Sequence, residues 1–556
     1  MKGAELVVEA LAAEGVQQVY GIPGTTIMDV LDVLAQQDRI RYMSVRHEQV
    51  AAFMADGFSR GSGEVGVCIG SRGPGAANMA TAIANAWDES VPLVALIGSV
   101  AHDIVERDAF EEMDLMSVFR PITKWAVEVP SAARIPELVQ RAVRTAKQGR
   151  PGPVVVSLPL SVLTAEAAVV PLPVTRAGLP RPAADDVAWA AELLQEARSP
   201  TIVVGGGMSS DADPVVLAEL AELTGAAVVT TWSRKDRFPN AHPAFLGALG
   251  AGALAVSDDA VRDADVLLAL GCRFSEFTTK RWTLVQPQTR IVQVDIDVEQ
   301  IGKIHPVAVG MPADAELAVA DLVAALRAAG QADEPVTAAR SARLTRLRAE
   351  HAEQTVLPDP DPATPPGTVP SAALTSALAQ LLDTSDVTLV VDAPSTGVWI
   401  SRYVDVPRPR GYYASAGGAM AWGFPAALGI ALARPDERVV CLSGDGSFWM
   451  VAQDLETAVR ERVPVVTVVA NNSAYGNTRD RQRSAHGGRF FGVFYDNPDL
   501  AAFAQLHGAH GERVTDPAEL LPALRRALDS RLPAVVDVVQ GQHEGLPPGI
   551  RPLPPR

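Results

Sequence analysis

Short apolar runs alternate with stretches of helical periodicity along almost the whole chain. Runs such as 266–270 and 387–391 are almost continuously apolar, and the segments between them repeat apolar residues every three or four positions. Continuous apolar runs are typical of strands that are buried on both faces of a parallel sheet. Their alternation with helices therefore predicts an α/β protein of doubly wound parallel sheets.

Two stretches break this alternation and divide the chain. Residues 172–184 are rich in proline, and residues 354–370 contain six prolines and no periodicity. Both compositions are typical of linkers. Because 556 residues are too many for a single core, we expect three domains, at 1–170, 187–330 and 371–545.

Charge and composition exclude several classes of function. The formal net charge is −17 and no basic run occurs, which argues against nucleic acid or an anionic membrane as a partner. No apolar run approaches the ~20 residues of a membrane-spanning helix, and Glu5 and Glu9 are unlike a signal peptide. Cys68, Cys272 and Cys441 lie in or beside apolar stretches without metal-ligand spacing. We therefore expect a soluble cytoplasmic protein.

A carboxylate and an amide follow two of the apolar runs. Gly-Asp-Gly at 444–446 follows the run 439–442, and Asn-Asn at 471–472 follows the run 465–469. The carboxyl ends of parallel strands are where open α/β sheets bind ligands. Carboxylate and amide oxygens suit a hard cation that also binds phosphate, and glycines let backbone N–H groups approach a diphosphate. A tight turn and an unrelated loop are the simpler alternative, which the spacing of the motifs disfavours.

Glu48 stands before a second informative segment. Residues 50–58 carry apolar side chains at helical spacing, so Glu48 is expected at a helix start. The helix dipole favours a carboxylate there. By itself such a residue is most often a solvated acid.

Together these motifs resemble thiamin diphosphate (ThDP) enzymes of the acetolactate synthase group. The resemblance covers most of the chain, and its further motifs, in the family's order, are Gly21-Ile22-Pro23-Gly24, Arg46-His47-Glu48, Gly73-Pro74-Gly75-Ala76 with Asn78, Arg120-Pro121-Ile122-Thr123-Lys124, Arg150-Pro151-Gly152-Pro153 and Ala416-Gly417-Gly418-Ala419-Met420. Segments 89–94 and 461–466 also resemble each other. They are either two ordinary helix-to-strand joints or, as the resemblance implies, signs that the pyrimidine-binding first domain and the diphosphate-binding third domain share a topology.

The resemblance implies cofactor contacts in the third domain. Asp445, the Asn472 side chain and the Ala474 carbonyl would hold Mg²⁺ against the diphosphate of ThDP. The other diphosphate-side contacts would come from Ser395, Thr396, Gly444, Gly446, Ser447, Tyr475 and Gly476. The cofactor performs the difficult chemistry, and the protein orients and tunes it.

Catalysis, by the same resemblance, would depend on Glu48, Gly418 and Met420. Glu48 would bond a pyrimidine ring nitrogen and shuttle a proton. The Gly418 carbonyl would accept from the exocyclic amine, and Met420 would wedge between the two rings. In the family the first-domain glutamate meets the third-domain groups across a subunit interface. The resemblance therefore implies a homodimer or homotetramer with interfacial active sites.

The reaction implied is decarboxylation of a small-molecule 2-oxo acid and joining of its product to a carbonyl acceptor. A hydroxyketone or an acetohydroxy acid would form. The predicted substrate pocket comprises Thr25, Arg72, Phe110, Thr478 and Arg481, with Glu111 as a further catalytic residue. Here the chain departs from acetolactate synthases, since Glu111 replaces a glutamine, Arg72 replaces a small polar residue and Arg481 stands at the position of a tryptophan.

The added arginines admit three interpretations. Arg479, Arg481 and Arg483 could form a solvated basic strip on a mobile loop. Alternatively, Arg72 or Arg481 could bind a carboxylate, phosphate or polyol of the substrate. Ion pairs within the protein are the third interpretation, since a buried charge is costly unless it is paired.

Other functions remain as alternatives. The run Glu111-Glu112-Met113-Asp114 is similar to oxalyl-CoA decarboxylases, which favours a ThDP-dependent decarboxylase or acyl-CoA lyase, but Gly-Asp-Gly-Ser at 444–447 differs from that family's Gly-Asp-Ser-Ala. A decarboxylase of the benzoylformate type is disfavoured because no histidine stands near 70–72. A non-enzymatic scaffold would not need Glu48, the aspartate and Asn472 together.

The middle domain carries a further glycine-rich turn, Gly-Gly-Gly at 205–207, after the apolar run 201–204. Such a turn can receive a nucleotide phosphate. It lacks the full dinucleotide glycine spacing. FAD, or ADP as in acyl-CoA-handling relatives, is therefore an alternative that the pattern does not favour over a purely structural domain.

Overall fold

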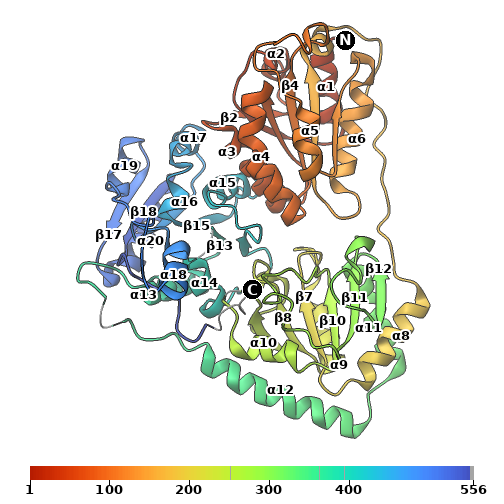
Figure 1. Ribbon diagram of the computed structural model, residues 1–556, viewed down its shortest axis with the longest axis vertical. Helices are drawn as coiled ribbons and strands as arrows, with labels where there is room; N and C mark the ends of the chain where they lie inside the picture. Colours follow the sequence, from red (N-terminus) through yellow and green to blue (C-terminus); the bar gives the residue numbers. More distant parts are fainter. Residues whose placement is uncertain (251, 362–363, 393–394, 551–556) are drawn as a thin grey trace.

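The computed structural model describes residues 1–250, 252–361, 364–392 and 395–550. In this part of the chain the strands form three sheets of six strands each. Every pairing between named strands is parallel, and helices cover the sheets (Figure 1). The predicted fold class, with three doubly wound parallel sheets, is confirmed.

The first and third sheets share one topology. The first runs in the order β2-β1-β3-β4-β6-β5 and the third in the order β14-β13-β15-β16-β18-β17. The first sheet comprises β1 Gln18–Gly21, β2 Arg41–Ser44, β3 Gly66–Ser71, β4 Leu93–Ser99, β5 Trp125–Glu128 and β6 Pro153–Pro159. The third comprises β13 Val387–Val391, β14 Tyr412–Ala414, β15 Arg438–Gly444, β16 Val466–Asn471, β17 His510–Val514 and β18 Ala534–Val539. The faint sequence echo between the two domains thus reflects a shared strand order.

The second sheet has a different order, β12-β11-β10-β7-β8-β9. It comprises β7 Thr201–Val204, β8 Ala227–Thr230, β9 Phe245–Ala248, β10 Val266–Leu270, β11 Arg290–Asp295 and β12 Val309–Pro312. Its order reverses between β7 and β10, which is the arrangement of dinucleotide-binding sheets.

The helices fall into three groups. Those of the first group are α1 Gly3–Ala13, α2 Met28–Ala35, α3 Glu48–Ser62, α4 Arg72–Glu89, α5 Leu115–Phe119, α6 Ile135–Lys147 and α7 Leu160–Thr164. The central ones are α8 Ala184–Glu196, α9 Pro214–Thr224, α10 Ala255–Arg262, α11 Ala315–Ala329 and α12 Glu334–Gln354. The last group is α13 Ser371–Thr384, α14 Ser395–Tyr403, α15 Gly423–Ala433, α16 Asp445–Phe448, α17 Leu455–Glu461, α18 Gly476–Ala485, α19 Leu500–Leu506 and α20 Pro517–Ser530.

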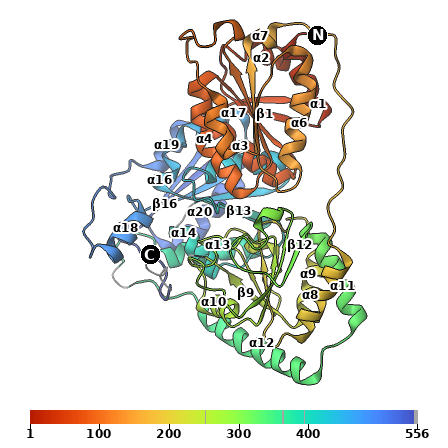
Figure 2. The same ribbon diagram turned by 45° about the vertical axis from the view of Figure 1, so that its right-hand side comes forward.

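An extended segment without helix or strand, residues 167–183, connects the first group to the central one and runs along the outside of the molecule (Figure 2). Helix α12 follows the central sheet and packs against it. The buried Arg340 of α12 donates to the Ala197 carbonyl at 2.8 Å, and Leu347 is fully buried. This helix lies beyond the boundary that we expected at residue 330.

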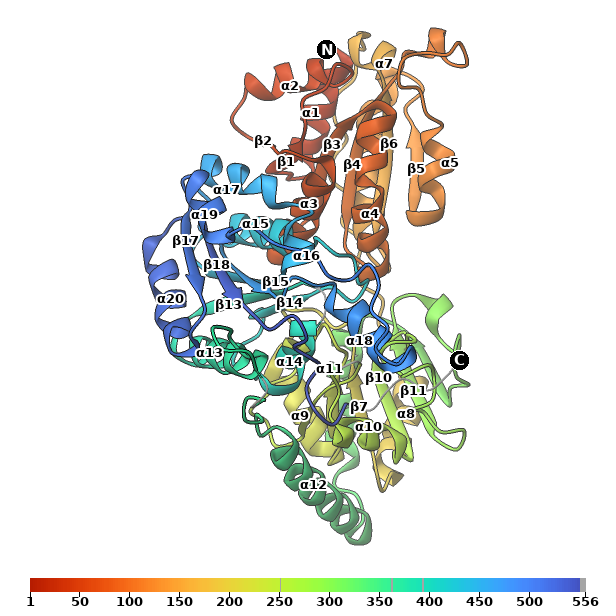
Figure 3. The same cartoon turned by 60° about the vertical axis from the view of Figure 1, so that its left-hand side comes forward.

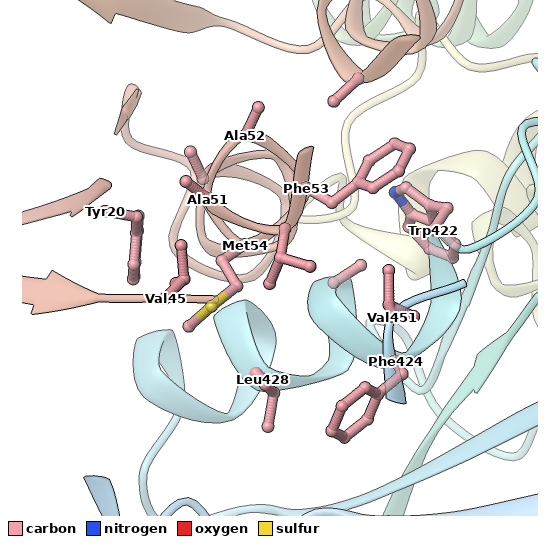
Figure 4. Close-up of a cluster of buried hydrophobic side chains, with 14 of the residues drawn as sticks. Tyr20, Val45, Ala51, Ala52, Phe53, Met54, Trp422, Phe424, Leu428 and Val451 are labelled. Carbon is pink, nitrogen blue, oxygen red and sulfur yellow. The ribbon is translucent and has the colours of Figure 1, made fainter. Parts of the chain in front are cut away.

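Helices α3 and α15 join the first and third groups through one shared core (Figure 3). A side-chain carbon at Gly57 would lie 2.1 Å from the Ala426 carbonyl oxygen, and one at Gly429 would lie 2.1 Å from that of Met54. Glycine is therefore required on both helices for this close crossing. Figure 4 shows Met54 of α3 directed toward the turns of α15 around Leu428.

The three cysteines are buried free thiols, as their apolar surroundings in the sequence suggested. Among the described residues, none of the helices combines the length and apolar composition that crossing a membrane requires.

Candidate functional site

Asp445 lies at the carboxyl end of β15, one residue beyond a pairing between Gly444 and Ala470 of β16. Its side chain is almost completely buried. The Oδ1 atom accepts hydrogen bonds from the Gly446 N–H at 2.9 Å and the Tyr495 hydroxyl at 3.0 Å. The Oδ2 atom accepts from the Ser473 N–H at 2.7 Å and the Asn497 side-chain amide at 2.7 Å. Burial raises the pKa of Asp445, and these hydrogen bonds oppose the rise.

Asn472 and Ala474 lie in the turn that follows β16, next to this carboxylate. Asn472 Oδ1 accepts from the Ala474 N–H at 3.1 Å. The turn is fixed because the Tyr475 N–H donates to the Val493 carbonyl at 2.8 Å. The structure thus brings the three predicted metal ligands to one edge of the sheet. Their oxygens are one carboxylate, one amide and one backbone carbonyl, a set that suits a hard cation shared with phosphate.

Tyr495 and Asn497 support this edge, and the sequence motifs did not include them. Besides Asp445, Asn497 donates to Asn471 Oδ1 at 2.8 Å and accepts from the Trp449 indole at 2.9 Å. Both residues lie between α18 and α19, where no periodicity or glycine motif marks them. Only the return of this segment to β15 reveals their role.

The glycines around Asp445 differ in the space they leave. A side-chain carbon at Gly444 would meet no atom within 4 Å, whereas one at Gly446 would lie 2.9 Å from the Tyr475 ring. A side chain at Gly476 would meet Ser395 Oγ at 2.9 Å. Thr396 follows Ser395 at the start of α14, and Ser447 is buried in α16. The predicted diphosphate-side residues therefore gather from the carboxyl ends of β13, β15 and β16.

Glu48 begins α3, where the sequence pattern expected a helix start. The His47 side chain caps this helix by accepting from the Gln49 N–H at 3.1 Å. The Asn78 amide donates to Glu48 Oε2 at 2.9 Å. A side-chain carbon at Gly75 would lie 3.2 Å from Glu48 Oε1, so glycine leaves this carboxylate accessible. The segment that contains Glu48 thus meets the segment of Gly75 and Asn78, which lies about thirty residues later in the sequence.

Gly418 and Met420 lie between β14 and α15. Gly418 has a φ of +72° and is exposed, and Met420 is half-buried. In the part of the chain that the structure describes, Glu48 accepts from Asn78 and makes no hydrogen bond to residues 418–420 or 444–447. Trp422, two residues beyond Met420, donates a 2.8 Å hydrogen bond to Asp56. Asp56 lies on α3, about 12 Å along the helix axis from Glu48.

The first-domain part of the predicted substrate pocket forms one cluster. The Arg72 guanidinium lies 3.7 Å from the Glu111 carboxylate and 5.4 Å from the centre of the Phe110 ring. Arg72 and Glu111 both have positive φ, +50° and +60°. Thr25 is exposed next to Thr26, whose hydroxyl lies 2.7 Å from that of Ser71. Strained backbone at two interacting residues is typical of functional sites.

Thr478 and Arg481 are exposed on α18, in the third group of elements. The interpretation of Arg479 to Arg483 as a solvated strip on a mobile loop is wrong, because the segment is helical and Arg479 is fully buried. Arg479 pairs with Asp480 at 2.9 Å and donates to the Gln542 carbonyl at 2.6 Å. Arg483 also pairs with Asp480, at 3.0 Å. Two of the three arginines are thus held within the protein.

The glycine-rich turn at 205–207 packs against the end of β10. A side-chain carbon at Gly205 would lie 2.2 Å from the Gly271 carbonyl oxygen, and one at Gly207 would lie 2.7 Å from Gly271 Cα. Close packing therefore accounts for these two glycines without a ligand. A cavity of about 410 Å³ adjoins the turn and reaches all three groups of elements. Its lining includes Arg60, Glu89, Arg150, Arg234, Arg273 and Asp295.

In comparisons with known proteins, family models match part of each of the three groups of elements. The models described as the N-terminal TPP binding domain, the central domain and the C-terminal TPP binding domain of thiamine pyrophosphate enzymes match residues 1–118, 187–322 and 392–538. A probable acetolactate synthase large subunit of Methanocaldococcus jannaschii is 34% identical, over 98% of this chain and 93% of its own. The acetolactate synthase isozyme 1 large subunit of Escherichia coli is 32% identical, over 99% and 96%. The acetolactate synthase large subunit of Corynebacterium glutamicum is 32% identical, over 98% and 87%.

Proposed function

The chain belongs to the thiamine pyrophosphate enzyme family, and we propose that it is a Mg²⁺-dependent carboligase of the acetolactate synthase type. It decarboxylates a 2-oxo acid and joins the product to a carbonyl acceptor, which forms a hydroxyketone or an acetohydroxy acid. The observation that carries this proposal is the buried Asp445 beside Asn472 at one sheet edge, in a chain whose relatives over nearly its whole length are named acetolactate synthases.

The edge around Asp445 fits a diphosphate and its metal ion. Asp445, Asn472 Oδ1 and the Ala474 carbonyl would hold Mg²⁺ next to the diphosphate. The open space beside Gly444 admits phosphate oxygens close to the backbone. The cofactor would be bound from its sides by Ser395, Thr396, Ser447, Tyr475 and Gly476.

Glu48, Gly418 and Met420 act on the other end of the cofactor. ThDP supplies a nucleophilic ring carbon when it is bound. The Glu48 carboxylate exchanges a proton with the pyrimidine ring nitrogen, and Asn78 holds that carboxylate in place. The Gly418 carbonyl would accept from the exocyclic amine, and the Met420 thioether would pack against the rings.

Two subunits complete each site. In one chain Glu48 contacts its own domain, and Arg46 rather than Glu48 reaches the third domain, through a 2.8 Å bond to Asp454. The first domain also exposes apolar side chains at Ile104, Val105, Phe110, Met113 and Val118. Exposed apolar side chains gathered in one segment are typical of an interaction surface. A homodimer or homotetramer, in which Glu48 of one subunit faces Gly418 and Met420 of another, accounts for both observations.

The substrate is bound between Thr25, Arg72, Phe110 and Glu111 on one side and Thr478 and Arg481 on the other. Arg481 is exposed on α18 and is available to an anionic group of the substrate. Arg72 is held by Glu111 at 3.7 Å, so Glu111 competes with a substrate carboxylate for this arginine. This acid belongs to the run Glu111-Glu112-Met113-Asp114, which favours the second candidate, a ThDP-dependent decarboxylase or acyl-CoA lyase. A scaffold role without catalysis is disfavoured by the assembled Asp445 edge.

Two further binding partners are candidates. The names of the relatives contain "large subunit", so a smaller partner chain is a candidate binding partner of this protein. FAD or ADP is the candidate ligand of the central cavity, although packing explains Gly205 and Gly207 without it.

The test is to incubate the protein with ThDP, Mg²⁺ and a panel of 2-oxo acids, with and without aldehyde acceptors. Carbon dioxide and products are measured by mass spectrometry. Pyruvate giving an acetohydroxy acid supports the carboligase. Free aldehyde as the sole product supports the decarboxylase instead, and no ThDP-dependent product from any of these acids contradicts the proposal.

A further inference from the structure

Glu89, the last residue of α4, has a fully buried carboxylate that accepts hydrogen bonds from the loop after β14. Glu89 Oε1 accepts from the Gly417 N–H at 2.7 Å, from the Ala416 N–H and from the Ser415 hydroxyl at 3.3 Å. Three donors of consecutive residues thus converge on one oxygen.

The other carboxylate oxygen is held by two arginines. Arg234, from the loop after β8, donates to Glu89 Oε2 at 2.8 Å, and Arg60 of α3 lies 3.4 Å from the same atom. Glu89 and Arg60 belong to the first group of elements and Arg234 to the central group. The N–H groups of Ala416 and Gly417, which Glu89 binds, belong to the third group. Glu89 therefore ties a third-domain loop to both of the other domains.

Glu89 is ionised at neutral pH. Burial by itself raises its pKa, but Arg60, Arg234 and the Gly417 N–H together hold the pKa of Glu89 at about 2. Buried ion pairs are weak evidence for stability, because the desolvation penalty offsets much of the attraction. A fixed, charged acceptor for backbone N–H groups does, however, hold a loop in one conformation.

Asn85 supports the same loop from one helical turn earlier in α4. Its Oδ1 accepts from the Ser415 hydroxyl at 3.0 Å. A side-chain carbon at Gly417 would lie 2.7 Å from that oxygen, so glycine is required at this position. The residue after Gly417 is Gly418, in the left-handed region, and Met420 follows two residues later.

We propose that Glu89 is a positioning residue, which fixes the amides of Ala416 and Gly417 and thereby sets where the Gly418 carbonyl and the Met420 side chain meet the cofactor. The inference rests on the proposed function, since it gives Gly418 and Met420 their roles. In this proposal Glu89 itself contacts neither ThDP nor the 2-oxo acid. It acts through the loop, and Arg234 extends its support into the central domain.

Glu89→Gln tests this inference by removing the charge at nearly constant shape. Exchange of the ThDP C2 proton is measured by NMR in the full-length protein at saturating ThDP and Mg²⁺, together with kcat and KM. We expect the exchange rate and kcat to fall about tenfold or more, because a small displacement of an orienting group has a large effect on rate. Glu89→Asp keeps the charge between the arginines, but its shorter side chain does not reach the amides. We therefore expect the exchange rate and kcat of this variant to fall as well. Rescue by Asp would show that only charge balance is required and would overturn the proposal.

Asp258→Asn is the matched control. Asp258 is a fully buried carboxylate that pairs with Lys280, and both residues belong to the central domain. We expect the C2 exchange rate of the Asp258→Asn variant to differ from that of the parent by less than about twofold. If Glu89→Gln does not fold, Arg234→Lys tests the same contact from the opposite side, and a reduced exchange rate is again expected.

The outcomes separate the inference from the proposed function. Absence of ThDP-dependent exchange in the parent protein contradicts the proposed function. Parent exchange that persists unchanged in Glu89→Gln, or in Arg234→Lys, contradicts only the positioning role. An equal loss in Asp258→Asn would mean that general destabilisation causes the effect, and this would also overturn the inference.

Discussion

The Asn78 side-chain amide donates a 2.9 Å hydrogen bond to the Glu48 carboxylate. The bond joins the start of α3 to the first turns of α4, two segments separated by a strand. It leaves the other carboxylate oxygen facing Gly75, where no side chain covers it. Glu48 is thus held in one orientation and remains open on one side, as a proton-transfer group requires.

Glu48→Gln should therefore abolish proton transfer and preserve cofactor binding. We expect the C2 exchange rate of bound ThDP to fall by about a hundredfold or more, with the ThDP dissociation constant nearly unchanged. NMR exchange and calorimetric titration measure the two quantities. Glu5→Gln is a matched control, since Glu5 lies in the first turn of α1, where its carboxylate caps the Lys2 N–H at 2.6 Å. Exchange at the parent rate in Glu48→Gln would contradict the role of this residue.

Asp445→Ala should remove the dependence of ThDP binding on Mg²⁺. The carboxylate is the one charged ligand in the predicted metal set, so the variant is expected to bind ThDP equally weakly with and without the ion. Asn497→Ala should give a smaller loss, because Asn497 orients Asp445 through a 2.7 Å bond. Titrations of ThDP at zero and saturating Mg²⁺ measure both effects. If Asp445→Ala still bound ThDP as tightly as the parent in the presence of Mg²⁺, the assignment of Asp445 as a metal ligand would be contradicted.

Substitutions at Arg72 and Glu111 should change substrate affinity in opposite directions. Arg72→Gln removes the cation, and we expect KM for the anionic acceptor to rise about tenfold, the effect of one charge-assisted hydrogen bond. Glu111→Gln removes the competing acid 3.7 Å away and should lower that KM several-fold. Steady-state kinetics with ThDP saturating measure both values, and the ThDP dissociation constant should stay constant. A rise in KM for both variants would show that the pair acts as a structural unit.

Asp454 should make folding stability depend on pH near neutrality. Burial raises the pKa of Asp454 from its ordinary value of 3.8 to about 6, while the Arg46 N–H and Thr457 oppose the rise and Glu456 adds to it. The folded protein therefore retains a proton that the unfolded chain releases. The stabilisation from this group is fully present below about pH 4 and is lost as the pH rises through 6.

Asp454→Asn mimics the protonated form and should abolish this dependence. We expect the free energy of unfolding of the variant, relative to the parent, to increase by about 1–2 kcal/mol between pH 5 and pH 7.5. Urea unfolding followed by tryptophan fluorescence at the two pH values measures the difference. Asp529→Asn is the control, since Asp529 is largely exposed. If the free energies of unfolding of variant and parent differed by the same amount at both pH values, the raised pKa of Asp454 would be contradicted.

The fold class, and the meeting of Asp445 and Asn472 at one sheet edge, were predictable from the sequence because both depend on local patterns. The almost continuously apolar runs mark buried parallel strands, and the residues after β15 and β16 must lie at the same sheet edge once the strands pair. Glu48 was placed at a helix start for the same reason. The roles of Tyr495 and Asn497 could not be predicted in this way, because their segment has no periodicity and reaches Asp445 only through the folded chain.

The sequence by itself determined the family, the three parallel sheets and the order of the cofactor motifs, since hydrophobic periodicity and short glycine-rich turns are properties of neighbouring residues. Only the tertiary structure decided the environment of individual charges. Arg479 and Glu89 appear in the sequence as ordinary polar residues, yet both are buried and held by partners far along the chain. Whether a charge is solvated or paired depends on which distant segments pack around it, and that information is not present in the local pattern.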